Sequence, residues 1–182
     1  MLVSLFLSSR PLSPTTSFRD LVSREVYVDN NENTQDARLI LQLRLMCRDP
    51  EMHSAHLWWR DSFWPETVDD YLKVEAALGT PENVRLGQVI SYWGMAAALV
   101  AQGTLGEHAL LSADFSEGLF EVFCKLRPFL ADLRKRTRKP GLLRNIEGLV
   151  TGSKRSRQRL AIVHKQFVLR RKEMSHRLAK AS

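Results

Sequence analysis

Cysteine is scarce in this chain of 182 residues, which contains only Cys47 and Cys124. Two cysteines are too few for a disulfide framework or a cysteine-rich zinc site. The most apolar stretch, Val89–Ala101, is also too short to span a bilayer, so no transmembrane helix is expected. Neither a phosphate-binding glycine-rich loop nor a dinucleotide-binding fingerprint occurs. We therefore assign no catalytic residue, no metal ligand and no cofactor from the sequence.

Charge is distributed unevenly along the chain. There are 27 Lys/Arg and 20 Asp/Glu, which gives a net charge of +7 at pH 7. Residues 1–133 hold 11 basic and 18 acidic side chains, whereas residues 134–182 hold 16 basic and 2 acidic ones. This asymmetry predicts an anionic partner: a nucleic acid, an acidic protein or an anionic membrane surface. The alternative is that the basic end packs against the acidic body of the same chain.

The N-terminal 33 residues differ from the rest. The segment Met1–Arg19 has no acidic side chain and several serines and threonines. We predict a flexible N-terminal arm over residues 1–33, with a brief extended segment at Val26–Val28 and a turn at Asp29–Asn31. Two explanations of residues 1–19 stay open: a targeting segment, or a start codon assigned too early.

Helical periodicity dominates from residue 34 onward. Apolar residues recur at three- and four-residue spacings, and no strand pattern appears after residue 33. The sequence predicts an all-α fold, with one bundle of six or seven helices over residues 34–152 and a basic amphipathic helix over residues 153–182. We expect the core to centre on Ile90, Trp93, Ala97, Leu119, Phe123, Leu126 and Leu130.

Several helix boundaries are marked by short signals. Thr67 with Asp70, and Thr104 with Glu107, have the spacing of a capping box, in which each residue satisfies a backbone N–H of the other. Pro128 lies inside the apolar pattern of residues 114–135, and we expect it to kink that helix near Leu126.

The order of four segments resembles a known family. These segments are ARLILQLRLMCRDP, HSAHLWWRDSFWP, VISYWGMAAALVAQGTLGEHALL and FCKLRPFLADLRKRTRKPGLLRNIEGLV. Together they are similar to the small helical bacterial proteins grouped as domain-of-unknown-function family 4760, over roughly residues 35–151. The resemblance implies a helical fold and a bacterial, cytoplasmic protein, and it supplies no catalytic residues. Some members look as if they have an N-terminal membrane helix. This sequence differs from them, because we do not expect Met1–Val28 to span a bilayer.

Two basic clusters form the candidate surface for an anionic partner. Their members are Arg134, Lys135, Arg136, Arg138, Lys139, Lys154, Arg155, Arg157, Arg159, Lys165, Arg170, Arg171 and Lys172. Neighbouring like charges destabilise a helix by about 0.2–0.5 kcal/mol per pair, so this run needs counter-charges. No motif that reads bases accompanies it, and contact with nucleic acid would therefore be sequence-nonspecific. An apolar stripe with Leu160, Val163 and Phe167 leaves self-association into a homo-oligomer open.

Three other groups are candidates for chemical sites. His53 and His56 lie one helical turn apart, as metal ligands can, and His108 follows an acidic residue. The tryptophans Trp58, Trp59 and Trp64 could stack on a ligand. We interpret the histidines as surface or boundary residues and the tryptophans as packing residues.

The sequence thus predicts a non-catalytic helical interaction module whose basic C-terminal region binds nucleic acid or an acidic protein. The main alternative is a helical scaffold or regulator at an anionic membrane surface, to which a cytoplasmic protein would attach peripherally. A third is an enzyme that uses His53, His56 or His108.

Overall fold

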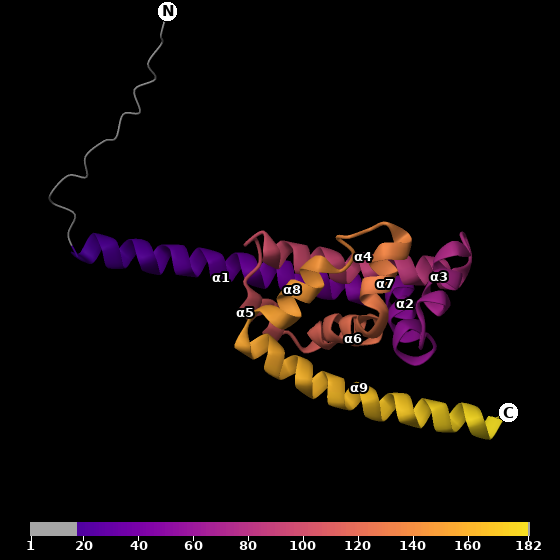
Figure 1. Cartoon of the computed structure of the whole chain (residues 1–182). Coiled ribbons are helices and arrows are strands. Elements are labelled where there is room, and N and C mark those ends of the chain that lie inside the picture. Colours follow the sequence, from indigo (N-terminus) through magenta and orange to yellow (C-terminus); the bar gives the residue numbers. More distant parts are fainter. Residues whose placement is uncertain (1–17, 182) are drawn as a thin grey trace, which may run out of the picture. The chain divides into compact units, whose positions relative to one another are not determined.

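A computed structural model describes the backbone of residues 18–181 and the side chains of residues 33–174. These residues form α-helices and two short 3-10 helices without a strand, which confirms the all-α prediction (Figure 1). The elements are α1 (Phe18–Arg48), α2 (Pro50–Asp61), α3 (Val68–Ala76), α4 (Pro81–Ala101), α5 (Glu107–Ser112), η1 (Asp114–Ser116), α6 (Glu117–Leu126), η2 (Arg127–Phe129), α7 (Leu130–Thr137), α8 (Arg144–Gly152) and α9 (Lys154–Ala181). The chain divides into two compact units, residues 1–35 and 36–182, and the second contains the packed helices discussed below.

Helix α1 begins at Phe18, well before the predicted start at Thr34. The extended segment and turn predicted at residues 26–31 are wrong, because these residues are helical. The stretch from Phe18 to Arg48 contains no proline or glycine, so nothing in it interrupts the backbone hydrogen bonds of a helix. Its polar residues only lower the helix propensity. Residues 1–17 of the predicted flexible arm lie outside the described residues.

The starts of α2 and α3 follow their sequence signals. Asp49 caps α2 by accepting hydrogen bonds from two backbone N–H groups of its first turn, and Pro50 opens the helix. The capping box predicted for α3 is confirmed: Asp70 Oδ2 accepts from the Thr67 N–H at 2.8 Å, and Thr67 Oγ1 accepts from the Asp70 N–H at 3.3 Å. These caps fix the ends of two helices that contact α4.

Helix α4 is the central element of the second unit, since α2, α3, α6 and α8 all pack against it. Its buried residues are Leu86, Val89, Tyr92, Trp93, Ala96 and Ala97. Ala96 and Ala97 are completely buried, and their small side chains let neighbouring helices approach closely. Among the described residues α4 alone has the length and apolar composition of a membrane span, properties that a core helix shares.

The predicted break at Pro128 is confirmed. Helix α6 ends at Leu126, the 3-10 turn η2 carries the proline, and α7 resumes at Leu130. Proline has no N–H to donate to the preceding turn and its ring collides with the carbonyl four residues earlier. The stretch predicted as one kinked helix is consequently η1, α6, η2 and α7 in the structure.

The predicted capping box of α5 is wrong. Gly106 is the N-cap residue of α5, and no side chain caps this helix. The Thr104 N–H donates to the Leu99 carbonyl in the turn that closes α4, so it is not available to the Glu107 carboxylate as the capping box requires. The Glu107 carboxylate instead accepts hydrogen bonds from the hydroxyls of Ser153 and Ser156, at 2.5 and 2.9 Å. Glu107 thereby ties α5 to the start of α9.

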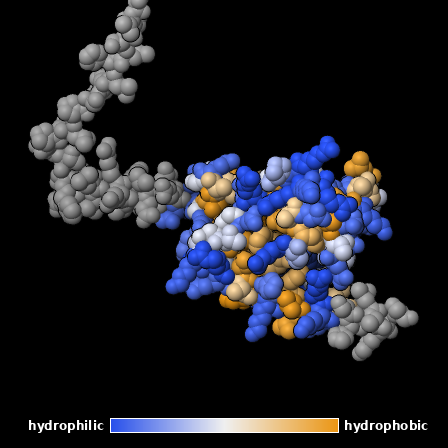
Figure 2. Space-filling model, in the orientation of Figure 1, coloured by the Kyte–Doolittle hydropathy of each residue, from blue (hydrophilic) through white to orange (hydrophobic). Residues whose placement is uncertain are grey.

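Six of the seven predicted core residues are buried: Trp93, Ala97, Leu119, Phe123, Leu126 and Leu130. The seventh, Ile90, is half-buried and packs against this core. Figure 2 shows that the visible surface is mainly hydrophilic, with separate apolar patches between charged side chains.

A charged residue also lies inside the core. Lys125 of α6 is only 3% exposed, and its Nζ donates hydrogen bonds to the carbonyl oxygens of Trp59, Arg60 and Phe63. The same ammonium lies 4.1 Å from the centre of the Trp64 ring, which is the geometry of a cation–π contact. Lys125 thus caps the C-terminal end of α2, where helix carbonyls lack intrahelical partners.

We predict that Lys125→Met destabilises the protein by about 2–4 kcal/mol, because it leaves these carbonyls buried without a donor. The measurement is the urea midpoint of unfolding, followed by circular dichroism. Lys135→Met is the matched control, since Lys135 is exposed, and it should change stability by less than about 0.5 kcal/mol. Equal midpoints for the two variants would contradict the capping role.

Candidate functional site

The structure pairs five of the thirteen predicted partner-binding cations with acidic side chains of the same chain. The pairs are Arg134–Glu147 at 2.7 Å, Arg136–Asp69 at 2.7 Å, Lys139–Glu75 at 3.0 Å, Arg170–Glu121, and Arg171–Glu66 at 3.3 Å. Four of these acids come from the acidic body that precedes residue 134. The packing of the basic end against this body, which the charge asymmetry left open, therefore occurs for part of the cluster.

Three further arginines bind neutral groups. Arg155 donates to the Ser112 hydroxyl at 3.1 Å, and Arg159 donates to the Leu111 carbonyl, so both attach α9 to the end of α5. Arg157 donates to the carbonyls of Thr151 and Gly152 at 2.8 and 2.9 Å, where it caps the C-terminal end of α8. These arginines keep their charge, but their hydrogen bonds fix their positions.

The remaining five predicted cations are exposed and have no ion pair with the described part of the chain. They are Lys135, Arg138, Lys154, Lys165 and Lys172. Arg138 ends α7 in the left-handed conformation, with φ 55°. The three lysines Lys154, Lys165 and Lys172 all belong to α9, where they are 11 and 7 residues apart. At about 100° per residue, these spacings place them within about 20° of one another around the helix.

Helix α9 is docked along one side. Leu160, Val163 and Phe167 are buried, and α9 packs against α6 and α8. The Phe167 ring stacks on Trp64, with ring centres 5.4 Å apart. The predicted apolar stripe therefore faces the body of the protein, and the lysine row occupies the opposite side of the helix.

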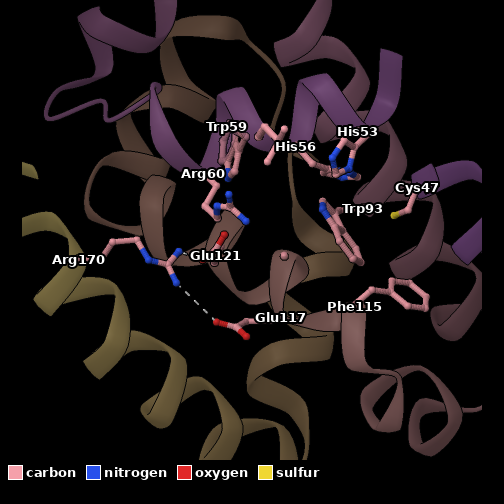
Figure 3. A pocket seen from close by; sticks show the side chains of 12 residues that line it. Cys47, His53, His56, Trp59, Arg60, Trp93, Phe115, Glu117, Glu121 and Arg170 are labelled. Atoms are coloured by element: carbon pink, nitrogen blue, oxygen red, sulfur yellow. Dashed lines mark hydrogen bonds and ion pairs between the residues drawn. The ribbon is translucent and has the colours of Figure 1, made fainter. Parts of the chain in front are cut away.

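The structure also forms a cavity that the sequence analysis did not predict. Its volume is about 320 Å³, and side chains from α1, α2, α4, η1, α6 and α9 line it (Figure 3). Its lining residues include Cys47, His53, His56, Trp59, Arg60, Trp93, Phe115, Glu117, Glu121 and Arg170. The α2 residues form one group that is close in sequence, and residues 115–121 form a second. Cys47, Trp93 and Arg170 come from other segments. The sequence did contain one sign of this site: Glu121 and Lys125 interrupt the apolar pattern of α6. Charged side chains buried within such a pattern need partners from other segments.

The electrostatics of the cavity centre on Glu121. Its carboxylate is nearly buried and binds the Arg170 guanidinium, which also lies 4.0 Å from Glu117. Burial lowers the pKa of the nearby Lys125 to about 7, and the charge of Glu121 opposes that shift. Arg60, on the α2 side, is held by Asp61 through two hydrogen bonds of 2.8 Å. Acidic and basic groups are thus balanced at this end of the cavity.

The histidine pair does not form a metal site in the described part of the chain, where no group of three or more His, Cys, Asp or Glu side chains could hold an ion. His53 is exposed, whereas His56 turns inward against Tyr92 and Trp93, with ring centres 5.2 and 5.8 Å away. Burial raises the pKa of Cys47 and raises that of Cys124 to about 11, which disfavours the reactive thiolate form of both side chains.

His56 generates a prediction on acid stability. Burial, and then the charge of His53, lower the pKa of His56 from 6.5 to about 4. Between these two pH values the unfolded chain binds a proton that the folded chain does not, so the folded state loses stability as the pH falls from 6.5 to 4. We expect His56→Phe to reduce this loss, measured as urea midpoints at several pH values. His164→Phe, on the exposed side of α9, should retain the wild-type slope; a wild-type slope in both variants would contradict the prediction.

Comparison with known proteins identifies the fold family. The family described as a domain of unknown function, DUF4760, matches residues 34–153, which include α2 to α8 and the greater part of the chain. No curated protein and no solved structure matches the chain. The resemblance inferred from the four sequence segments is thereby confirmed, and the chain belongs to the DUF4760 family.

Proposed function

We propose that this protein is a non-catalytic interaction module that binds an acidic partner protein through the outward face of α9. The observation that carries the proposal is the row formed by Lys154, Lys165 and Lys172, which the described part of the chain leaves without ion pairs. The rise of about 1.5 Å per residue separates these lysines by about 16 and 10 Å along the helix. Such a row matches a partner with spaced carboxylates.

Apolar side chains beside the lysines favour a protein over a nucleic acid. Ile162 and Leu169 are 61% and 54% exposed, and their seven-residue spacing places them on one side of α9 next to the lysine row. A phosphate backbone offers these side chains nothing apolar to contact, whereas an amphipathic acidic helix offers both carboxylates and apolar groups. The outward face therefore combines charge complementarity with an apolar contact.

The docked side of α9 supports the proposal by holding this face in place. Phe167, Arg170 and Glu121 attach the middle of the helix to the body of the protein, so the lysines extend from a helix that is already packed. A preformed surface loses less conformational freedom on binding than a free tail would lose. The residues that bind the partner and those that bind the body are thus divided between two sides of one helix.

A membrane surface is the second candidate, since the same exposed Ile162 and Leu169 flanked by lysines could enter a headgroup layer. Phe167, the aromatic residue of α9, is buried on the docked side and so adds nothing to such a contact. This observation favours the protein partner over the membrane.

The test measures binding of the full chain to three probes: a labelled peptide of alternating glutamate and leucine clusters, a short DNA duplex, and vesicles containing phosphatidylserine. We expect the peptide to bind at low salt, and the triple variant K154E/K165E/K172E to weaken binding at least tenfold. Ile162→Ser with Leu169→Ser should weaken it severalfold. The matched control is R38E/R48E/K73E, whose exposed cations lie on other helices, and it should change affinity less than twofold.

Each alternative gives a different result. If DNA binds through the three lysines with no effect of Ile162 and Leu169, the partner is a nucleic acid and the proposal of an acidic protein fails. If the vesicles bind but the peptide does not, the membrane candidate replaces it. Equal weakening by the control triple variant would show that net charge alone matters and would remove the assignment to α9.

A further inference from the structure

Three buried polar atoms lack a hydrogen-bond partner in the described part of the chain: His56 Nε2, Trp59 Nε1 and Trp93 Nε1. All three belong to residues that line the same cavity between α2, α4, α6 and α9 (Figure 3). A buried polar group without a partner costs folding free energy, and native structures contain few of them. Their concentration in residues around one cavity points to a ligand there that supplies the missing partners.

The chemistry of the three atoms defines one side of that ligand. An indole N–H can only donate a hydrogen bond, so Trp59 and Trp93 both require acceptors. Imidazole Nε2 donates or accepts according to the tautomer, and His56 is neutral because burial lowers its pKa to about 4. A ligand suited to this wall therefore has acceptor atoms, such as ring nitrogens or carbonyl oxygens, along one edge.

The remaining walls define the body of the ligand. Trp93 and Phe115 are stacked on each other, with ring planes inclined by 27° and ring centres 6.2 Å apart, and both contribute aromatic surface to the cavity. A planar ring can pack against such a surface by offset stacking. The volume of about 320 Å³ is at the lower end of the range for small-molecule sites, which suits a ligand of one or two rings.

The charged end of the cavity excludes a highly charged ligand. Arg60, Arg170 and the adjacent Lys125 are balanced by Asp61, Glu117 and Glu121. An inorganic phosphate or a cation would meet groups of its own sign at close range. Glu117 is partly exposed and can accept a hydrogen bond from a ligand N–H, so both donors and acceptors are available to a neutral molecule.

From these walls we infer that the cavity binds a small, uncharged heteroaromatic molecule of one or two rings with hydrogen-bond acceptors on one edge. His53 and Leu57, which are exposed, lie where the cavity meets solvent and would leave the ligand a path of entry. Because the two indole nitrogens are themselves shielded from solvent, binding requires the Trp59 and Trp93 rings to turn slightly toward the ligand. This inference is independent of the outward face of α9.

The experiment follows the four indole N–H signals of the full ¹⁵N-labelled chain by NMR, each assigned with a Trp→Phe variant. The probes are adenine, uracil, nicotinamide and benzimidazole, with the hydrocarbon indene and inorganic phosphate as controls. At least one heteroaromatic probe should shift the Trp59 and Trp93 signals downfield, as a new hydrogen bond does. The signals of Trp58 and Trp64 should shift far less, since neither residue lines the cavity and Trp64 Nε1 already donates to the Asp61 carbonyl.

Variants provide a second readout by calorimetry. Trp93→Phe keeps an aromatic ring but removes the N–H, and we expect it to weaken binding at least tenfold. Trp58→Phe is the matched control and should bind within twofold of wild type. The inference is overturned if none of the four heteroaromatic probes shifts the two signals, if indene binds as tightly as they do, or if phosphate competes with them. Because the NMR shifts are measured on the wild-type chain, they test the inference even where a variant fails to fold.

Discussion

Two charged side chains buried in α6, Glu121 and Lys125, constrain how the surrounding helices are joined. Lys125 binds carbonyl oxygens at the end of α2, and Glu121 binds Arg170 of α9. A buried charge that loses its partner destabilises a protein by about 3–5 kcal/mol, so neither attachment is easily given up. One turn of α6 therefore fixes the end of α2 and the middle of α9 at the same time.

Both candidate surfaces depend on this attachment. Because Arg170 and Phe167 hold α9 against the body, Lys154, Lys165 and Lys172 are presented on its opposite side. The same arginine and Glu121 form the charged end of the cavity lined by the tryptophans. The outward face and the cavity are separate in chemistry, since one is cationic and exposed while the other is aromatic and balanced in charge, yet a single cluster positions both.

Signals that act locally were predicted well. The capping box at Thr67 and the break at Pro128 need only neighbouring backbone groups, and both are present in the structure. The capping box predicted for α5 failed because other groups in the structure bind its two residues. Thr104 remains engaged in the turn that ends α4, and Glu107 binds two serines more than 40 residues away. Helix α1 extends back to Phe18 because no proline or glycine interrupts its polar first half. Apolar periodicity could not predict this part of the helix, since its residues are mostly polar.

The sequence by itself determined the helical class, most of the core and the presence of excess positive charge near the C-terminus, since these follow from periodicity and composition. Only the tertiary structure decided which cations are neutralised, because an ion pair such as Arg171–Glu66 depends on distance in space and its partners are 105 positions apart. It also assembled the cavity, whose walls come from helices far apart in the chain. The spacing of apolar residues in the sequence predicts which face of a helix is buried. Which helix packs against that face depends on the tertiary structure.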